Sequence, residues 1–266
     1  MIRIGIGGWL YAPWRGTFYP DGLAQSRELS YASARLDIIE INSTYYRAQT
    51  PSTFAKWREE TPDGFMFSVK APMFATNRKV LADAGPVVEK FVSGGVAELG
   101  PKLGPVVWEF APTKPFDADD FGAFVAMLPE KIGGMRAMHV LDVRHPSFRS
   151  VEYLKLARNA GITTVFTDAD DPASFADITG SFIYARVKRA SAKFVHGFKA
   201  QELDRLAARA MIWASGGEPD DVPRVEPSRG PGNPRPVFML MISGDKQKAP
   251  AAATALRRRL SGKRPS

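Results

Sequence analysis

The segment LDIIEINSTYYR, residues 36–47, combines a short apolar strand with a group of polar side chains that follow it directly. Its three isoleucines are β-branched, which favours a strand. Because side chains alternate along a strand, Glu40 and Asn42 lie on one face, opposite Ile39 and Ile41. A carboxylate without a partner is costly to bury. The segment therefore predicts a buried strand whose C-terminal end enters a functional site.

Eight strand-like segments occur along the chain, and helix-like segments lie between most of them. The predicted strands are residues 3–7, 37–42, 65–70, 106–110, 137–143, 163–167, 182–187 and 237–242. The predicted helices are residues 24–35, a helix opening at Pro51, and residues 85–99, 117–128, 151–160, 199–214 and 250–260. Such an alternation favours parallel strands with right-handed crossovers. Eight units typically close into a barrel of about 250 residues.

We therefore predict an α/β fold, a single TIM-type (β/α)8 barrel over residues 1–266. The alternative is a doubly wound open sheet, which usually has a Gly-rich phosphate turn after its first strand. Residues 5–9 read GIGGW and lack that pattern. Residues 216–236 are rich in Pro and Gly without apolar periodicity, so we predict a flexible loop there. Residues 261–266 are predicted to form a frayed basic tail.

The composition, with 44% hydrophobic and 24% charged residues, is typical of a soluble globular protein. The absence of cysteine excludes disulfides, thiol catalysis and cysteine-bound metals. No run of about 18 apolar residues occurs, so no membrane partner is expected. The N-terminal residues resemble a first strand more than a signal peptide, and we predict a cytoplasmic protein. The oligomeric state is left open.

The net charge is +8 and the pI is near 9.7, which favours an anionic partner, either a small molecule or nucleic acid. Part of this excess lies in the basic end of the last predicted helix and the tail, where it also suits the helix dipole and a solvated surface. Charge alone therefore does not decide between a binding site and an ordinary basic surface.

Polar side chains gather at the C-terminal ends of the predicted strands, where (β/α)8 barrels carry their active sites. The residues at these ends are Glu40, Asn42, Lys70, Glu109, Asp142, Arg144, His145, Thr167, Asp168, Arg186, Lys188, Ser243, Asp245 and Lys246. The opposite strand ends are mostly Gly, Pro or apolar. This asymmetry is the strongest sequence argument for a functional face.

Three of these residues are candidates for catalysis. Glu40 or Asp142 is a candidate general base, and His145 is a candidate general acid because its ordinary pKa is about 6.5. Each also has a structural explanation. Glu40 would pair with Lys70 or Arg144, Asp142 would brace Arg144, and His145 would brace the turn at its following proline.

The remaining candidates would bind the substrate. The cations that would hold an anion are Lys70, Arg144, Arg186 and Lys188. Five aromatic residues form either a stacking platform for a base or sugar or a lid over the barrel mouth: Trp9, Tyr11, Trp14, Tyr45 and Tyr46. Ser243 precedes the last predicted helix, where many barrels bind phosphate. Asn42, Thr44 and Glu109 complete the set of predicted binding residues.

No motif for nucleotide phosphates, zinc hydrolysis or a serine hydrolase occurs, and no cofactor is predicted. A divalent metal held by carboxylates is an alternative. The carboxylates in question are Glu40, Glu109, Asp142 and Asp168. The cations Lys70, Arg144 and Arg186 argue against this, because they would already neutralise the carboxylates.

Several segments resemble the YecE-like family, the domain of unknown function 72. They are Gly7-Gly8-Trp9, Phe18-Tyr19-Pro20, EINSTYYR at 40–47, FMFSVKAP at 65–72, Leu103-Gly104-Pro105 and Arg144-His145-Pro146-Ser147-Phe148. The resemblance covers nearly the whole chain and implies a TIM-type barrel, with no established reaction to carry over. Three positions depart from the pattern: Glu109 stands for a usual Gln, Lys188-Arg189 for His-Gly, and Ser243-Gly244-Asp245 for an Asn pair.

The leading hypothesis is a protein that binds, and in its fuller form hydrolyses, an anionic, phosphate-bearing ligand at the C-terminal barrel mouth. One alternative is a non-catalytic nucleic-acid-binding protein, whose affinity would fall steeply with salt. Another is a metal-dependent phosphoesterase or nuclease. Whether the protein is an enzyme is left open by the sequence.

Overall fold

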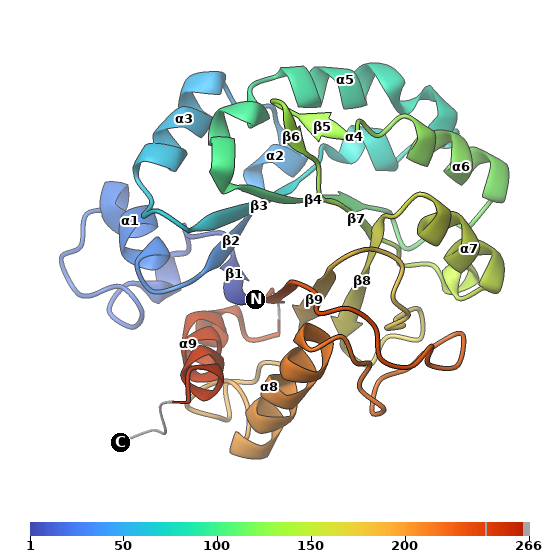
Figure 1. Cartoon of the computed structure of the whole chain (residues 1–266). Helices are drawn as coiled ribbons and strands as arrows, with labels where there is room; N and C mark the ends of the chain where they lie inside the picture. The colour runs from blue at the N-terminus through green and yellow to red at the C-terminus, as the bar shows by residue number, and fades with distance from the viewer. Residues whose placement is uncertain (243, 263–266) are drawn as a thin grey trace.

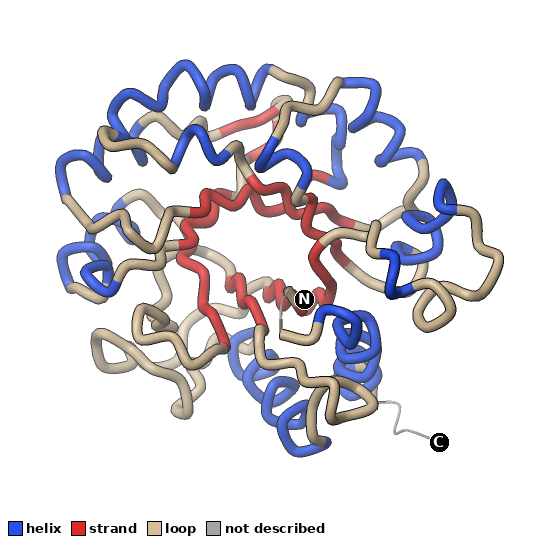
Figure 2. The backbone as a smooth tube through the Cα atoms, turned by 180° about the vertical axis from the view of Figure 1, so that it is seen from behind, coloured by secondary structure: helices blue, strands red, loops and turns tan. Residues whose placement is uncertain are grey.

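The computed structural model describes residues 1–242 and 244–262. Eight parallel strands close into a barrel in the order β1-β10-β9-β8-β7-β4-β3-β2, visible as the ring of strands in Figure 2. The barrel strands are β1 (Ile2–Gly7), β2 (Ile38–Ile41), β3 (Met66–Lys70), β4 (Leu103–Glu109), β7 (His139–Asp142), β8 (Thr163–Asp168), β9 (Ile183–Val187) and β10 (Val237–Met241). The predicted TIM-type barrel is confirmed.

Helices surround this barrel (Figure 1). They are α1 (Glu28–Ser33), α2 (Ser43–Tyr46), α3 (Pro51–Glu59), α4 (Met73–Thr76), α5 (Gly85–Ser93), α6 (Ala118–Ala126), α7 (Val151–Asn159), α8 (Ala200–Ala214) and α9 (Ala249–Leu260). A small hairpin of β5 (Lys131–Ile132) and β6 (Met135–Arg136) precedes β7. Every helix within the described residues is too short or too polar to span a bilayer.

Two details of the predicted helices are wrong. The helix predicted over residues 85–99 ends at Ser93, and a 3-10 segment, Val96–Lys102, follows Gly94 and Gly95. Gly95 has a φ of 104°, a left-handed conformation that favours glycine and breaks the helix. The polar residues that follow β2 lie outside every predicted helix, but they form the single turn α2.

Apolar side chains fill the barrel interior below its C-terminal end. The inward-facing set is Ile38, Val107, Val140, Val165, Phe182, Tyr184, Phe238 and Leu240. A second apolar layer packs the outer face of the barrel against the helices. Because the lower interior is filled, only the C-terminal end of the barrel, called the mouth here, leaves room for charged side chains from the strands.

Gly5 sets the close approach of β1 and β2. A Cβ atom at this position would lie 1.8 Å from the carbonyl oxygen of Ile38, far inside any van der Waals contact. Gly5 is also paired with Ile38 in the sheet register. Only glycine fits here, and this contact fixes the position of β2, whose next inward residue is Glu40.

The loop at residues 216–236 contains no helix or strand. The carboxylate of Asp177 accepts hydrogen bonds from the backbone N–H groups of Val225 and Glu226, at 2.8 and 3.0 Å. The backbone N–H of Ala176 donates to the carbonyl oxygen of Pro223. These bonds tie the middle of the loop to the barrel, and its flexibility stays a prediction. Of the predicted tail, residues 263–266 lie outside the described residues.

Candidate functional site

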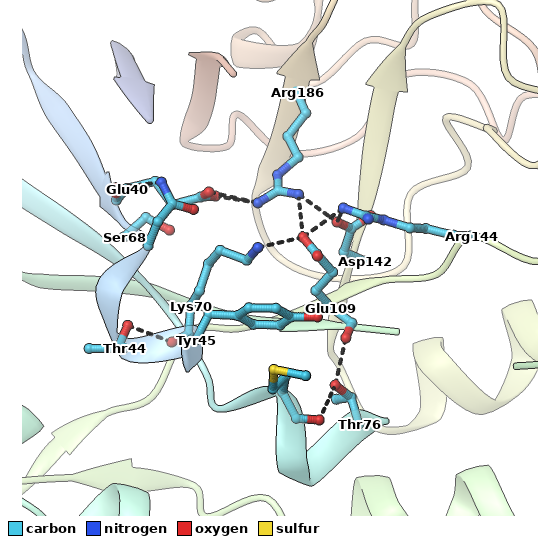
Figure 3. Close-up of polar contacts among 12 residues, drawn as sticks. Glu40, Thr44, Tyr45, Ser68, Lys70, Thr76, Glu109, Asp142, Arg144 and Arg186 are labelled. Atoms are coloured by element: carbon cyan, nitrogen blue, oxygen red, sulfur yellow. Dashed lines mark hydrogen bonds and ion pairs between the residues drawn. The ribbon is translucent and has the colours of Figure 1, made fainter. Parts of the chain in front are cut away.

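Arg186 on β9 is the centre of the charged side chains at the mouth (Figure 3). Its Nη2 donates to both carboxylate oxygens of Glu40 on β2, at 2.7 and 2.6 Å. Its Nη1 donates to Asp142 on β7 at 2.6 Å and to Glu109 on β4 at 3.0 Å. One guanidinium group therefore joins carboxylates from three strands that are distant in the sequence.

Two further cations contact the same carboxylates. The Nζ of Lys70 on β3 lies 2.8 Å from the Glu109 carboxylate. The Nη2 of Arg144, just after β7, lies 2.6 Å from Glu109 and 2.8 Å from Asp142. We call this group, together with Lys188, the mouth cluster. Its members are Glu40, Lys70, Glu109, Asp142, Arg144, Arg186 and Lys188.

The cations of the mouth cluster keep two of its carboxyl groups ionised. Burial raises the pKa of Asp142, but Arg186 and Arg144 more than offset this and hold the pKa below its ordinary value. Burial and the Asp142 carboxylate raise the pKa of Glu109. The opposing effect of Arg144, Arg186 and Lys70 is larger, so the pKa is below its ordinary value. Burial alone would lower the pKa of Arg186, yet the carboxylates of Glu40 and Asp142 hold it well above its ordinary value.

A polar layer supports the mouth cluster from below. The hydroxyl of Tyr184 donates to Glu40 at 2.7 Å and lies 2.8 Å from the hydroxyl of Ser68. Burial and the Glu40 carboxylate raise the pKa of Tyr184 well above its ordinary value, so the hydroxyl stays a neutral donor. Sequence reasoning missed both residues. Strand alternation could have found Tyr184, because it is two residues before Arg186 and therefore lies on the same face of β9.

Lys188 is the one cation of the mouth cluster whose side chain makes no hydrogen bond or ion pair with any described residue. It is partly buried, two residues beyond Arg186. Burial lowers the pKa of Lys188 below its ordinary value. The Asp142 carboxylate acts against this and raises the pKa, while the positive charges of Arg144 and Arg186 lower it further. The Nε atoms of Arg144 and Arg186 are buried and also lack an acceptor among the described residues. The mouth therefore has more donors than protein acceptors.

Other predicted residues lie beside the mouth cluster. The ring of Tyr45 lies 4.0 Å from the Nζ of Lys70 and forms one wall of the cluster (Figure 3). Burial and Glu109 raise the pKa of Tyr45. Thr44 is buried and donates to the carbonyl oxygen of Lys70 at 2.7 Å. The amide of Asn42 lies near the backbone of Gly7 at the end of β1.

The remaining predicted residues lie elsewhere. The Nδ1 of His145 accepts from the backbone N–H of Ser147, so the imidazole caps the following turn. Trp14 is fully buried and donates to the carbonyl oxygen of Lys246, and Trp9 packs edge-on against Trp57 of α3.

Tyr11 packs against the buried Trp14 ring and lies 4.5 Å from the Nζ of Lys246. Ser243 lies outside the described residues. The predicted aromatic platform is therefore divided. Tyr45 lies at the cluster with the exposed Tyr46 packed edge-on against it, and the other three aromatic residues lie in the loop after β1.

Asp168 does not join the other carboxylates. It is buried at the end of β8, but its carboxylate pairs with Arg189 at 2.8 Å and with Arg209 of α8 at 3.0 Å. Within the described residues, no three His, Cys, Asp or Glu side chains are grouped so that they could hold a metal ion. The donor set suggested for a divalent metal is thus divided between two sites and neutralised by cations.

The fold and this cluster define a single-chain (β/α)8 barrel protein with a charged C-terminal mouth. A family model described as "Protein of unknown function DUF72" matches residues 3–266. The chain therefore belongs to the DUF72 family, as the sequence resemblance predicted.

Two curated relatives share part of the sequence. The UPF0759 protein YecE of Escherichia coli strain K12 is 27% identical over 149 residues, which cover 56% of this chain and 50% of YecE. The UPF0759 protein YunF of Bacillus subtilis strain 168 is 35% identical over 71 residues, covering 27% of this chain and 24% of YunF. The chain thus matches about half the length of YecE and about a quarter of YunF.

Solved structures show the same fold. A DUF72 family protein from Thermotoga maritima MSB8 superimposes with a TM-score of 0.72 at 20% identity, covering 99% of this chain and 100% of that one. A DUF72 family protein from Enterococcus faecalis V583 gives a TM-score of 0.67 at 15% identity, with 98% of both chains covered. At this identity the likeness concerns the fold alone.

Proposed function

We propose that the mouth of the barrel binds a small anionic molecule that carries a phosphate group. The observation that supports this is the charge balance of the mouth cluster, which has four cations and three carboxylates. All three carboxylates already contact a cation. The unbalanced positive charge is that of Lys188, and burial makes such a charge costly unless a partner anion binds.

Lys188 and Arg144 are the groups that would hold the phosphate. Guanidinium and ammonium groups form strong, charge-assisted hydrogen bonds to phosphate oxygens. The side chain of Arg144 is 25% exposed, more than any other paired member of the mouth cluster. Tyr45 would flank the ligand opposite β9, since its ring already packs on Lys70.

The carboxylates have a positioning role in this proposal. Glu40 has no exposed side-chain surface and accepts from Arg186 and Tyr184. Asp142 and Glu109 have lowered pKa values, which makes them weak bases near neutral pH. The hydrolysis predicted from the sequence, with Glu40 or Asp142 as general base, is therefore not part of the proposal.

Phosphate-dependent thermal stabilisation tests the proposal. Inorganic phosphate is titrated at constant ionic strength against chloride, and the unfolding midpoint should rise with phosphate because a ligand of the folded state stabilises it. Lys188→Met should weaken phosphate binding about tenfold or more, since a hydrogen bond to a charged group contributes about 1.5–3 kcal/mol.

The matched control is Lys193→Met. Lys193 follows the same strand, is exposed and makes no side-chain ion pair with any described residue, so its loss removes the same charge from a residue that is not part of the mouth cluster. This variant should keep the phosphate response of the unmodified protein. The proposal fails if phosphate leaves the midpoint unchanged, or if both lysine variants lose the response equally.

A further inference from the structure

A cavity of about 450 Å³ lies outside the barrel, among helices α2, α3, α4 and α5 in the upper part of Figure 1. Its apolar wall consists of Phe54, Pro72, Phe74, Val87 and Phe91. Its volume is within the range of about 300–1,000 Å³ that is common for small-molecule sites. None of its described lining residues belongs to the mouth cluster, although Thr44, which lines the cavity, donates to the backbone of Lys70. The cavity is therefore a separate candidate site next to the mouth.

Two aromatic rings at this cavity are unusually exposed. The side chain of Phe74 is 61% exposed and that of Tyr46 is 67% exposed. Both residues line the cavity. Single exposed apolar residues are common on proteins, but two large rings beside an apolar cavity form a patch of the kind that marks interaction sites. The patch would be covered by a ligand with an apolar body.

The charges around the cavity are all positive. Arg47, Arg78 and Lys90 line it, and no acidic residue is found among its described lining residues. The side chains of Arg47 and Lys90 make no hydrogen bond or ion pair with any described residue. The guanidinium of Arg78 donates to the carbonyl oxygens of Phe74 and Asp83, so its charge has no carboxylate partner there. Such a rim is complementary to an anion.

A buried donor in the same cavity lacks an acceptor. The side-chain Nε2 of Gln49 is buried without a hydrogen-bond partner among the described residues, and Gln49 lines the cavity. Leaving a buried donor unsatisfied costs about 1–3 kcal/mol. The Nε2 atom is covered in this conformation, so an oxygen atom of a bound molecule would satisfy it after the Gln49 side chain turns its amide into the cavity.

We propose that this cavity binds an aromatic organic acid. Its ring system would pack against Phe74, Val87 and Phe91, and its acidic group would lie among the cations of the rim. An oxygen of that group would accept from Gln49. This site is independent of phosphate binding at the mouth, and either can exist without the other.

The test compares two fluorescent probes that differ in one charged group. The anionic probe is 8-anilinonaphthalene-1-sulfonate, and N-phenyl-1-naphthylamine is its neutral relative. Both are titrated into the native protein. We expect one site that binds the anion about tenfold or more tightly than the neutral probe, because the rim attracts only the charged group.

Charge reversal at the rim sharpens the test. In the double variant Arg47→Glu/Lys90→Glu the preference for the anionic probe should disappear, while the neutral probe binds as before. The control is Lys155→Glu on α7, an exposed lysine outside the cavity without an ion pair among the described residues. It should keep the preference of the unmodified protein.

Gln49→Leu distinguishes a ligand contact from a structural role. This variant removes the unsatisfied donor, so its unfolding midpoint should stay equal or rise, while the affinity for the anionic probe falls. The proposal is overturned if the two probes bind equally well, or if the rim variants leave the affinity for the anionic probe unchanged. It is also overturned if sedimentation shows a dimer whose formation abolishes probe binding, because a second copy would then cover the patch.

Discussion

Two groups of charged side chains at the barrel can be compared directly. The mouth cluster lies inside the barrel. A second group, the outer cluster, lies between β8 and α8 and consists of Asp168, Asp170, Arg189, Arg205, Arg209 and Asp221. The outer cluster has three cations and three carboxylates, whereas the mouth cluster has one more cation than carboxylates. A cluster with equal numbers of cations and carboxylates is suited to holding two elements of the fold together. A cluster with one more cation than carboxylates is suited to binding an anion.

The geometry of the outer cluster supports this contrast. Arg209 of α8 is almost fully buried and donates to Asp168 at 3.0 Å and to both carboxylate oxygens of Asp221 at 3.0 Å. These bonds fasten α8 to the end of β8. Charged residues at a strand end are thus not functional by position alone, since the face on which they lie decides their role.

The largest expected difference between the clusters is the cost of losing the central arginine. Arg186→Met leaves Glu40 buried without a cation, which should lower the free energy of unfolding by about 3–5 kcal/mol. Arg209→Met should cost about 1–3 kcal/mol, because Asp168 keeps Arg189 and Asp221 is partly exposed. Urea denaturation measures both. Equal losses of unfolding free energy in Arg186→Met and Arg209→Met would contradict the comparison. If Arg186→Met does not fold, Arg186→Lys, which keeps the charge, is measured in its place.

Acid should destabilise the protein partly through the mouth cluster. The pKa values of Asp142 and Glu109 are lowered in the folded state, so the unfolded chain binds more protons as the pH falls. Their stabilising contribution is complete above the ordinary carboxyl pKa and is lost as the pH falls toward the lowered values. Glu109→Gln should therefore flatten the dependence of unfolding free energy on pH, followed by urea denaturation from about pH 6 to about pH 3.

The matched substitution for this acid series is Asp63→Asn. Asp63 is an exposed carboxylate without an ion pair among the described residues. If Glu109→Gln and Asp63→Asn gave the same pH dependence, the acid sensitivity would not come from the mouth cluster.

Phosphate binding should itself depend on pH. The pKa of Lys188 is lowered by burial, so its ammonium group loses the proton at a lower pH than an ordinary lysine. In calorimetric titrations, phosphate affinity should then fall as the pH rises and should be lost before the ordinary lysine pKa of about 10.4 is reached. Lys188→Arg keeps the charge and should show a flat profile. If phosphate affinity depended on pH in the same way in the unmodified protein and in Lys188→Arg, Lys188 would not be part of the phosphate site.

The smallest expected effect is that of Arg189→Met in the outer cluster. Arg189 is 45% exposed, and exposed ion pairs contribute about 0–1 kcal/mol. The loss in unfolding free energy should therefore stay below about 1 kcal/mol, with no change in the phosphate response. A larger loss would mean that Asp168 depends on Arg189 as much as on Arg209.

The alternation rule explains how much could be predicted from the sequence. Glu40, Lys70, Glu109 and Asp142 were all predicted at the mouth, and they meet there because each lies an even number of residues from an inward apolar position on its strand. Asp168 was assigned to the same strand-end set by position alone. It lies three residues after the inward Val165 and therefore points outward to α8.

Loop residues could not be placed in this way. Trp14 is buried among the aromatic residues of its own loop, and its indole N–H donates to the carbonyl oxygen of Lys246, which is 232 residues away in the chain. No local pattern encodes such a contact. The cap formed by His145 depends on the backbone of a short 3-10 turn, which Pro146 favours but does not specify. Strand periodicity is local and loop packing is not, so the positions of the strand residues were predicted better than those of the loop residues.

The apolar filling of the lower barrel has a kinetic consequence. Ile38, Val140, Phe238 and their neighbours close the interior beneath Arg186, so a molecule at the mouth has one route in and the same route out. An occupant has to leave before its replacement can enter. Its dissociation rate should therefore be independent of the concentration of a competing molecule in solution.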